Sequence, residues 1–152
     1  MRIEQKVTID APRHLVWHYV TEPANYPVFM EGLTRWDVAG DRHKGLGARY
    51  RVLFRVGAAD VGGLIEVVEW QPDGDMAWSS VTGVDQRGRW RLREQSDGRT
   101  RVTFRFAYGV AGGGITALIA ERVAARSLNQ RFHDSLLNVK RTVESQSRAA
   151  VG

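Results

Sequence analysis

Two glutamates are the residues of this sequence best placed to do acid–base chemistry. Glu66 lies in an alternating stretch on the same side as Leu64 and Trp70, and Glu94 lies on the same side of another stretch as Trp90. A carboxyl group held in apolar surroundings has a raised pKa and can act as a general acid or base. We therefore name Glu66 and Glu94 as the candidate catalytic residues, although bulges and strand ends often turn such side chains outward.

The four histidines do not form a recognisable metal site. His14 and His18 lie four residues apart, a spacing that brings two imidazoles to one side of a helix. The His-Glu-x-x-His pattern is missing and no third ligand lies nearby in the sequence. We interpret this pair, His43 and His133 as surface residues and predict no bound metal.

Sequence patterns for cofactor binding and nucleophilic catalysis are also missing. The run Gly112–Gly114 precedes a helix but lacks the Lys-Ser/Thr of a phosphate-binding loop, so we interpret it as a hinge. The hydroxyls of Ser79, Ser80 and Thr82 have no base nearby in the sequence, and the chain contains no Cys. We predict that the protein uses no cofactor.

The elements that must position a site alternate with a period of two through most of the chain. From Ala48 to Val56 the even positions are mainly aromatic or β-branched and most odd ones are arginine, which predicts a strand with one buried face. The same pattern predicts strands near 3–9, 34–39, 61–70, 76–82, 86–94 and 102–108. One-sided alternation favours an antiparallel sheet of seven strands that is exposed to solvent on one face only.

Two segments have helical spacing instead. The first begins near Asp10-Ala11-Pro12, where Asp10 can cap the helix and Pro12 suits an early helical position. The second runs from Ile115 to about Glu144 with one apolar stripe, and residues 145–152 are predicted to be a frayed tail. This long helix is the only element large enough to cover the apolar face of the sheet.

Composition limits the class of protein. The 152 residues are 43% apolar and 26% charged, which fits a single globular domain over 1–152. No run of about 18 apolar residues is present, and the first residues lack the apolar stretch of a signal peptide. We therefore expect a cytoplasmic protein.

Arginine accounts for all but three of the 22 basic residues and gathers on the predicted outer face of the sheet. No aromatic residues are interleaved there for base stacking, so we expect no nucleic-acid binding. A solvated face partly paired with acidic neighbours is one interpretation, and transient contact with an anionic membrane surface is another. The arginines concerned are Arg49, Arg51, Arg55, Arg87, Arg89, Arg91, Arg93, Arg101 and Arg105.

Several motifs resemble the START-like superfamily, also called helix-grip or SRPBCC, and within it the bacterial polyketide cyclase/dehydrase and lipid-transport group. They are Ile9-Asp10-Ala11-Pro12, Val16-Trp17, Tyr26-Pro27-Val28-Phe29, Val68-Glu69-Trp70-Gln71-Pro72, Trp78 and the segment 136–144. The resemblance implies an α+β helix-grip fold, in which a curved seven-stranded antiparallel sheet wraps around a long C-terminal helix. It also implies a hydrophobic cavity between the two.

The predicted function depends on that cavity. We expect it to bind a hydrophobic small molecule, such as a lipid, an isoprenoid or an aromatic polyketide. The alternatives are a polyketide aromatase/cyclase-type enzyme and an interaction or toxin-like module that acts through the arginine-rich face. The same aromatic residues could instead fill the space as an ordinary core. The predicted lining residues are Tyr50, Phe54, Trp78, Trp90, Phe104, Phe106, Tyr108, Ile119, Val123 and Phe132.

Overall fold

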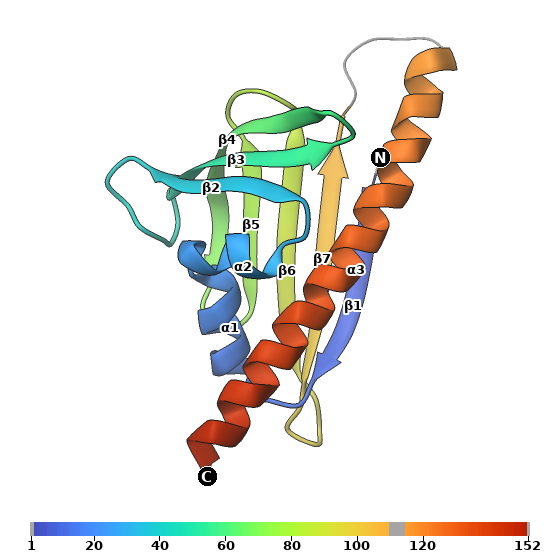
Figure 1. Ribbon diagram of the computed structural model, residues 1–152. Coiled ribbons are helices and arrows are strands. Elements are labelled where there is room, and N and C mark those ends of the chain that lie inside the picture. Colours follow the sequence, from blue (N-terminus) through green and yellow to red (C-terminus); the bar gives the residue numbers. More distant parts are fainter. Residues whose placement is uncertain (1, 110–114, 152) are drawn as a thin grey trace.

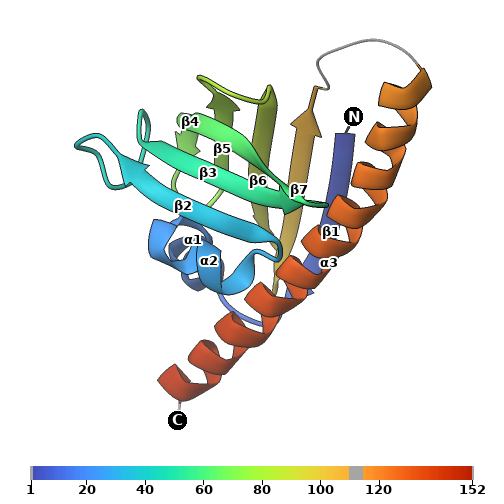
Figure 2. The same ribbon diagram turned by 45° about the horizontal axis from the view of Figure 1, so that its top comes forward.

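A curved antiparallel sheet and a long helix that runs across one of its faces make up the fold (Figures 1 and 2). The computed structural model describes residues 2–109 and 115–151, with side chains described for 2–109 and 126–151. The predicted α+β helix-grip fold is confirmed. Within the described residues, no helix combines the length and the apolar character that a membrane span requires.

All seven predicted strands are present in one sheet, in the order β1-β7-β6-β5-β4-β3-β2. Every neighbouring pair is antiparallel. The strands are β1 (Arg2–Ile9), β2 (Leu33–Ala39), β3 (Arg49–Val56), β4 (Ala59–Gln71), β5 (Asp75–Ser80), β6 (Gln86–Glu94) and β7 (Thr100–Tyr108). Because β1 and β2 form opposite edges, the chain between them must cross the sheet. It does so through α1 (Arg13–Thr21), the 3-10 turn η1 (Pro23–Asn25) and α2 (Tyr26–Phe29).

Alternation along the strands separates an inner face, which α1, α2 and the long helix cover, from an outer face exposed to solvent. On β3, Tyr50, Val52 and Phe54 are buried, whereas Arg49 and Arg51 are exposed. Strands β6 and β7 show the same division, with Trp90 and Phe104 among the buried residues. The predicted inner face is therefore confirmed.

A β-bulge in β4 reverses this alternation within the strand. The register with β5 shifts between Val67 and Glu69, which leaves Val68 as the extra residue. Residues on the two sides of the bulge consequently change faces. Trp70 pairs with the buried Met76 after the bulge, while Glu66 before it lies on the outer face.

The helix α3 (Ile115–Val151) presents its predicted apolar stripe to the sheet. Phe132, Leu136, Val139 and Val143 are each at most 2% exposed. The predicted frayed tail after Glu144 is wrong, because α3 continues through Val151, and residues 145–151 contain no Gly or Pro that would end it. Within α3, the side chains of Ile119 and Val123 lie outside the described residues, as does the Gly112–Gly114 run before it.

The start of α1 differs from the expectation. Pro12 occupies the N-cap position and no side chain caps the helix, so the predicted role of Asp10 is wrong. The Asp10 amide instead donates a hydrogen bond to Glu144 Oε2 at 3.1 Å. The Lys140 ammonium group binds the same carboxylate at 2.6 Å and also reaches the carbonyl oxygen of Thr8 at 3.0 Å. These contacts attach the end of β1 to α3.

Truncation of Phe132 tests how completely α3 closes the core. Its ring centroid lies 5.1 Å from that of Phe104 and 5.2 Å from that of Phe106, and the residue is 1% exposed. We predict that Phe132→Ala lowers the free energy of unfolding by about 3–5 kcal/mol. Leu137→Ala, at a position 37% exposed on the same helix, should cost less than about 1 kcal/mol. Denaturant titration of both variants measures the difference, and a loss below about 1 kcal/mol for Phe132→Ala would contradict tight packing.

Candidate ligand-binding site

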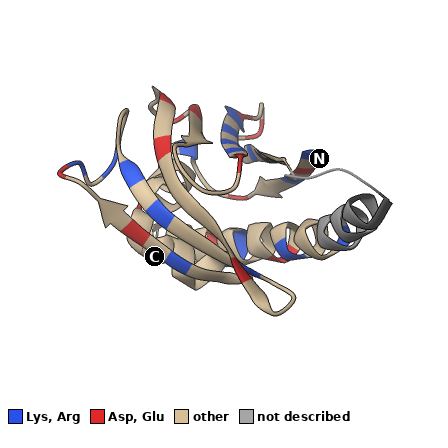
Figure 3. Cartoon of the chain, turned by 90° about the horizontal axis from the view of Figure 1, so that it is seen from above, with Lys and Arg blue, Asp and Glu red and all other residues tan. Residues whose placement is uncertain are grey.

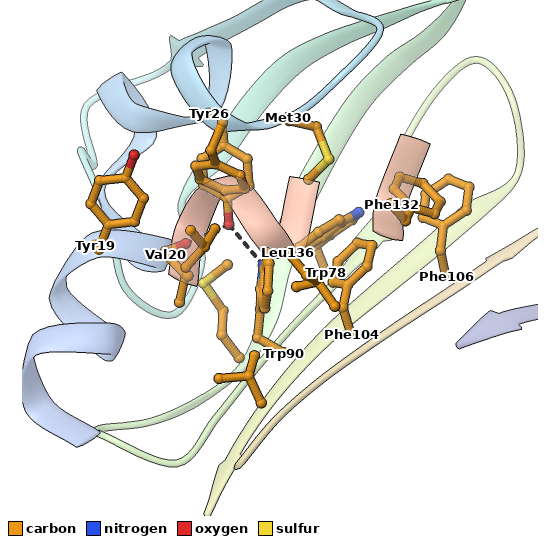
Figure 4. Packing of buried hydrophobic residues seen from close by; sticks show 14 of the residues in the cluster. Tyr19, Val20, Tyr26, Met30, Trp78, Trp90, Phe104, Phe106, Phe132 and Leu136 are labelled. Atoms are coloured by element: carbon orange, nitrogen blue, oxygen red, sulfur yellow. Dashed lines mark hydrogen bonds between the residues drawn. The ribbon is translucent and has the colours of Figure 1, made fainter. Parts of the chain in front are cut away.

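The predicted lining residues whose side chains are described lie together on the inner face and α3. Phe54, Phe104, Phe106 and Phe132 form a group in which neighbouring ring centroids lie 5.1–6.3 Å apart. Trp78 joins this group through Phe104, at 5.9 Å. Tyr50, Trp90 and Tyr108 border it, and of all these residues Tyr108 is half-buried while the others are buried. We call this set the inner aromatic cluster (Figure 4).

One end of the cluster is closed by a hydrogen-bonded network. The Trp90 indole Nε1 donates to the Tyr26 hydroxyl at 3.0 Å, and that hydroxyl donates to the carbonyl oxygen of Val20 at 2.6 Å. Tyr26 also stacks on Trp36, with ring centroids 3.9 Å apart. Burial raises the pKa of Tyr26 well above its ordinary value, although the hydrogen bond from Trp90 lowers it, so the hydroxyl keeps its proton. Trp90 therefore has its polar atom satisfied by the protein itself.

Two other tryptophans carry unsatisfied polar atoms. The Nε1 groups of Trp36 and Trp78 are buried and have no hydrogen-bond acceptor within the part of the chain that the structure describes. The two rings meet edge to face at 5.5 Å. In the view of Figure 4 the Trp78 nitrogen points in the direction of Phe132. A buried donor without a partner costs roughly 1–3 kcal/mol, a cost that an acceptor beside either indole would remove.

Gly88 holds the Trp78 ring in place. It is the direct partner of Trp78 in the β5–β6 register, and a Cβ atom at Gly88 would lie 2.1 Å from Cζ2 of the indole. The indole therefore packs directly against the Gly88 backbone, at a place where no larger residue fits. The alternation of Gln86, Gly88 and Trp90 on the inner face is the sequence signal for this contact, which our sequence analysis did not use.

A family model described as polyketide cyclase/dehydrase and lipid transport matches residues 1–144. The chain belongs to this family. The match confirms the resemblance that the motifs indicated. No curated protein matches the chain.

Solved structures share the fold of this family member at low sequence identity. TTHA0849 from Thermus thermophilus is 17% identical with a TM-score of 0.82, over 97% of this chain and 99% of that protein. DR_A0006 from Deinococcus radiodurans is 21% identical with a TM-score of 0.72, over 96% and 99% of the two chains. The Zhui aromatase/cyclase from Streptomyces sp. R1128 is 18% identical with a TM-score of 0.70, over 100% and 96%.

Neither candidate catalytic glutamate of this polyketide cyclase/dehydrase family member lies in apolar surroundings. The bulge in β4 leaves Glu66 on the outer face, where its Oε1 accepts a hydrogen bond from Arg49 Nε at 2.8 Å. Glu94 is exposed at the end of β6, opposite Thr100. The expectation that Glu66 faces the cavity is therefore wrong, and Glu94 is exposed at the end of its strand instead of being held in apolar surroundings.

The histidines lie at the surface as expected. His14, His18 and His133 are exposed, and His43 Nε2 lies 2.8 Å from Glu22 Oε1. Within residues 2–109 and 126–151, no three metal-ligating side chains gather into a group.

Carboxylates pair with many of the arginines on the outer face of the sheet. Asp75 lies 2.7 Å from Arg93, 3.2 Å from Arg89 and 3.6 Å from Arg91. Burial of Asp75 would raise its pKa, but the hydrogen bond from Arg93 and the charges of the three arginines outweigh this effect and lower the pKa below its ordinary value of 3.8. The Arg-rich face of this family member is thus partly neutralised by the sheet itself.

Substitution of Gly88 tests its role beneath Trp78. Because a methyl group has no room there, we predict that Gly88→Ala lowers the free energy of unfolding by about 1–3 kcal/mol or displaces the indole. Gly74→Ala is the matched control, since its nearest atom would lie at an ordinary 3.5 Å. Thermal unfolding with near-ultraviolet circular dichroism measures both effects. Equal behaviour of the two variants would contradict the close contact.

Substitution of Asp75 tests the arginine cluster. We predict that Asp75→Asn lowers the free energy of unfolding by roughly 1–2 kcal/mol at neutral pH, because three guanidinium groups lose their shared carboxylate. The folded-state pKa of Asp75 is lowered, so its stabilisation is present above about pH 3.8 and disappears as the pH falls through the lower, folded-state pKa. The difference in unfolding free energy between Asp75→Asn and the wild type should therefore vanish once the pH lies below that folded-state pKa.

Unfolding free energies between pH 7 and pH 2.5 measure this prediction. Asp37→Asn removes an exposed pair with Arg35 and should have little effect at any pH. A stability difference for Asp75→Asn that persists unchanged at pH 2.5 would refute the proposed charge effect.

Proposed function

We propose that this protein binds a hydrophobic small molecule between the inner face of the sheet and α3, with a ligand oxygen accepting a hydrogen bond from Trp78 Nε1. The observation that carries the proposal is this buried indole donor, which no described residue satisfies. It belongs to a group of aromatic side chains, so a ligand there would gain apolar contact and one directed polar contact.

The chemistry of the cluster defines the class of ligand. Burial of apolar surface contributes about 25 cal/mol per Å², which favours a largely hydrocarbon or aromatic molecule. A donor such as an indole N–H requires a neutral or anionic oxygen in return, which quinones, aryl ketones and fatty acids all provide. This class agrees with the description of the family, which includes lipid transport and polyketide conversion.

Cyclase-type catalysis is the second candidate function. It is supported by the family description and by the similarity to the Zhui aromatase/cyclase. Such catalysis needs a titratable group beside the ligand. Among the described inner-face residues, the buried hydroxyls of Tyr26 and Tyr50 are the nearest equivalents. Burial, with a contribution from the charge of Glu22, raises the pKa of Tyr50 to about 12, so its hydroxyl keeps its proton, which it donates to the carbonyl oxygen of His43 at 2.8 Å.

A pair of probes that differ only in their oxygens tests the binding proposal. We predict that 2-methyl-1,4-naphthoquinone binds and raises the melting temperature through linkage. Trp78→Phe keeps an aromatic ring but removes the donor, and should weaken the quinone about tenfold, which corresponds to about 1.4 kcal/mol. The affinity for 2-methylnaphthalene should change less than twofold. Isothermal titration calorimetry measures the affinities of the wild type and of Trp78→Phe for each of the two ligands.

Trp70→Phe is the matched control, because Trp70 packs against Trp17 at 5.0 Å and belongs to no contact of the cluster around Phe132. This variant should leave both affinities unchanged. If Trp78→Phe weakens the binding of the quinone and of the hydrocarbon by the same factor, Trp78 does not donate a hydrogen bond to the ligand. If quinones, fatty acids and aromatic polyketides all leave the melting temperature unchanged, and native mass spectrometry detects no co-purified lipid, the binding proposal is wrong.

A further inference from the structure

A hollow lies on the outer face of the sheet, opposite to the side that α3 covers. It has a volume of about 530 Å³ and spans strands β1, β7, β6, β5 and β4. Small or apolar residues form part of its lining, among them Val68, Ala77 and Ala107. The volume falls in the range of sites for small organic molecules. We call it the outer hollow.

Two arginines flank one alanine in the outer hollow. Across the sheet, Arg2 on β1 pairs with Ala107 on β7, and Ala107 pairs in turn with Arg87 on β6. Neighbouring strands lie about 4.8 Å apart, so the two arginine backbones are separated by about 10 Å. Ala107 offers only a methyl group between them, which leaves room above it for a group that both guanidinium groups can reach.

Ion pairing distinguishes these two arginines from the others in the hollow. Arg89 is held by Glu69 and Asp75, and Arg105 lies 3.2 Å from Glu4. Arg2 and Arg87 are exposed and have no carboxylate within ion-pair distance in the described parts of the chain. Figure 3 shows both basic and acidic positions on the strands, and among the four arginines that line the outer hollow only Arg2 and Arg87 lack a carboxylate partner in the described residues.

The surroundings of this arginine pair are mostly positive. A smaller hollow of about 300 Å³ is also lined by Arg2, Arg87 and Ala107, and Asp85 is among its other lining residues. The Asp85 carboxylate accepts a hydrogen bond from the Ser80 hydroxyl at 3.4 Å and is not within 4 Å of either guanidinium. In the outer hollow, the acidic residue is Glu69, which Arg89 already neutralises.

We propose that the outer hollow binds a phosphomonoester that carries an apolar or aromatic group. The phosphate would lie between Arg2 and Arg87 above Ala107, and the apolar group would lie beside it, against the hydrocarbon stems of the arginines that line the hollow, since Ala77 is only 7% exposed. A phosphomonoester has a charge near −2 and three acceptor oxygens, so it can satisfy two guanidinium groups at once. A carboxylate has one charge and two oxygens and fits one guanidinium.

Binding of small phosphates to the full chain at low salt tests this proposal. Phenyl phosphate should bind at least fivefold more tightly than inorganic phosphate, because only its ring packs against the arginine stems of the hollow. Phenol, which lacks the charge, should not bind at the same concentrations. Heteronuclear NMR titration, with the amide of Ala107 as the local reporter, measures the affinities and places the site.

Four variants separate the site from the general charge of the face. Arg2→Gln and Arg87→Gln should each lower the affinity for phenyl phosphate at least fivefold. Ala107→Leu fills the space without a change of charge and should weaken it by a similar factor. Arg51→Gln is the matched control, since Arg51 is exposed on the same face but does not line the hollow, and it should change the affinity less than twofold. Unchanged melting temperatures verify that the variants fold.

Three outcomes would overturn the proposal. Equal weakening in Arg51→Gln would mean that a diffuse positive field attracts phosphate. Unchanged affinity in Arg2→Gln and Arg87→Gln would place the phosphate elsewhere, and phenol binding as tightly as phenyl phosphate would show that charge plays no part.

Vesicles distinguish the two sources of such a ligand. Binding to phosphatidylcholine vesicles that contain phosphatidic acid, lost in Arg87→Gln, would identify a lipid headgroup. Binding of phenyl phosphate without vesicle binding would identify a free phosphomonoester. Either result supports the site. The inner site is independent of this test, because the two sites lie on opposite faces of the sheet.

Discussion

Burial of the aromatic inner face of the sheet against α3 is the interaction on which the other features depend. A sheet with aromatic residues on one side must be covered, and Phe132 supplies the central contact by meeting Phe54, Phe104 and Phe106. Because aromatic rings leave few polar partners nearby, each polar atom enclosed with them lowers the stability unless it finds a hydrogen-bond partner. Trp90 is satisfied by Tyr26, whereas Trp78 has no acceptor among the described residues. The same apolar enclosure therefore both stabilises the fold and leaves two indole donors, those of Trp36 and Trp78, without an acceptor among the described residues.

The outer face follows from the inner one, because strands with one buried side must expose the other. Arginine on neighbouring strands would repel if it were unpaired. Asp75, Glu69 and Glu4 reduce this repulsion by pairing with Arg93, Arg89 and Arg105, among others. Within the described strands, Arg2 and Arg87 on either side of Ala107 are among the arginines of this face that no carboxylate pairs. The two faces thus offer different environments, one apolar with few polar atoms and one rich in arginine.

Period-two alternation was sufficient to predict the seven strands and the inner face, since each residue's face follows from local spacing alone. The same rule failed for Glu66, because the bulge at Val68 depends on pairing with β5 and leaves no local signal. The expected cap at Asp10 failed for a similar reason, because its amide is bound by Glu144, which is distant in sequence. The Trp90–Tyr26 hydrogen bond and the missing acceptor of Trp78 likewise arise between residues distant in sequence, so spacing could not predict them.

The attachment of β1 to α3 has a consequence for synthesis on the ribosome. In the sheet β1 pairs with β7 alone, and the backbone after it is fastened to Glu144 on α3. The first strand of the domain to be translated therefore finds its partners only when β7 and α3 have emerged. Contacts of such long sequence separation form slowly, and a nascent chain that stops before β7 exposes β1 as an unpaired edge. This domain must consequently complete its fold as one unit, after its last helix has left the ribosome.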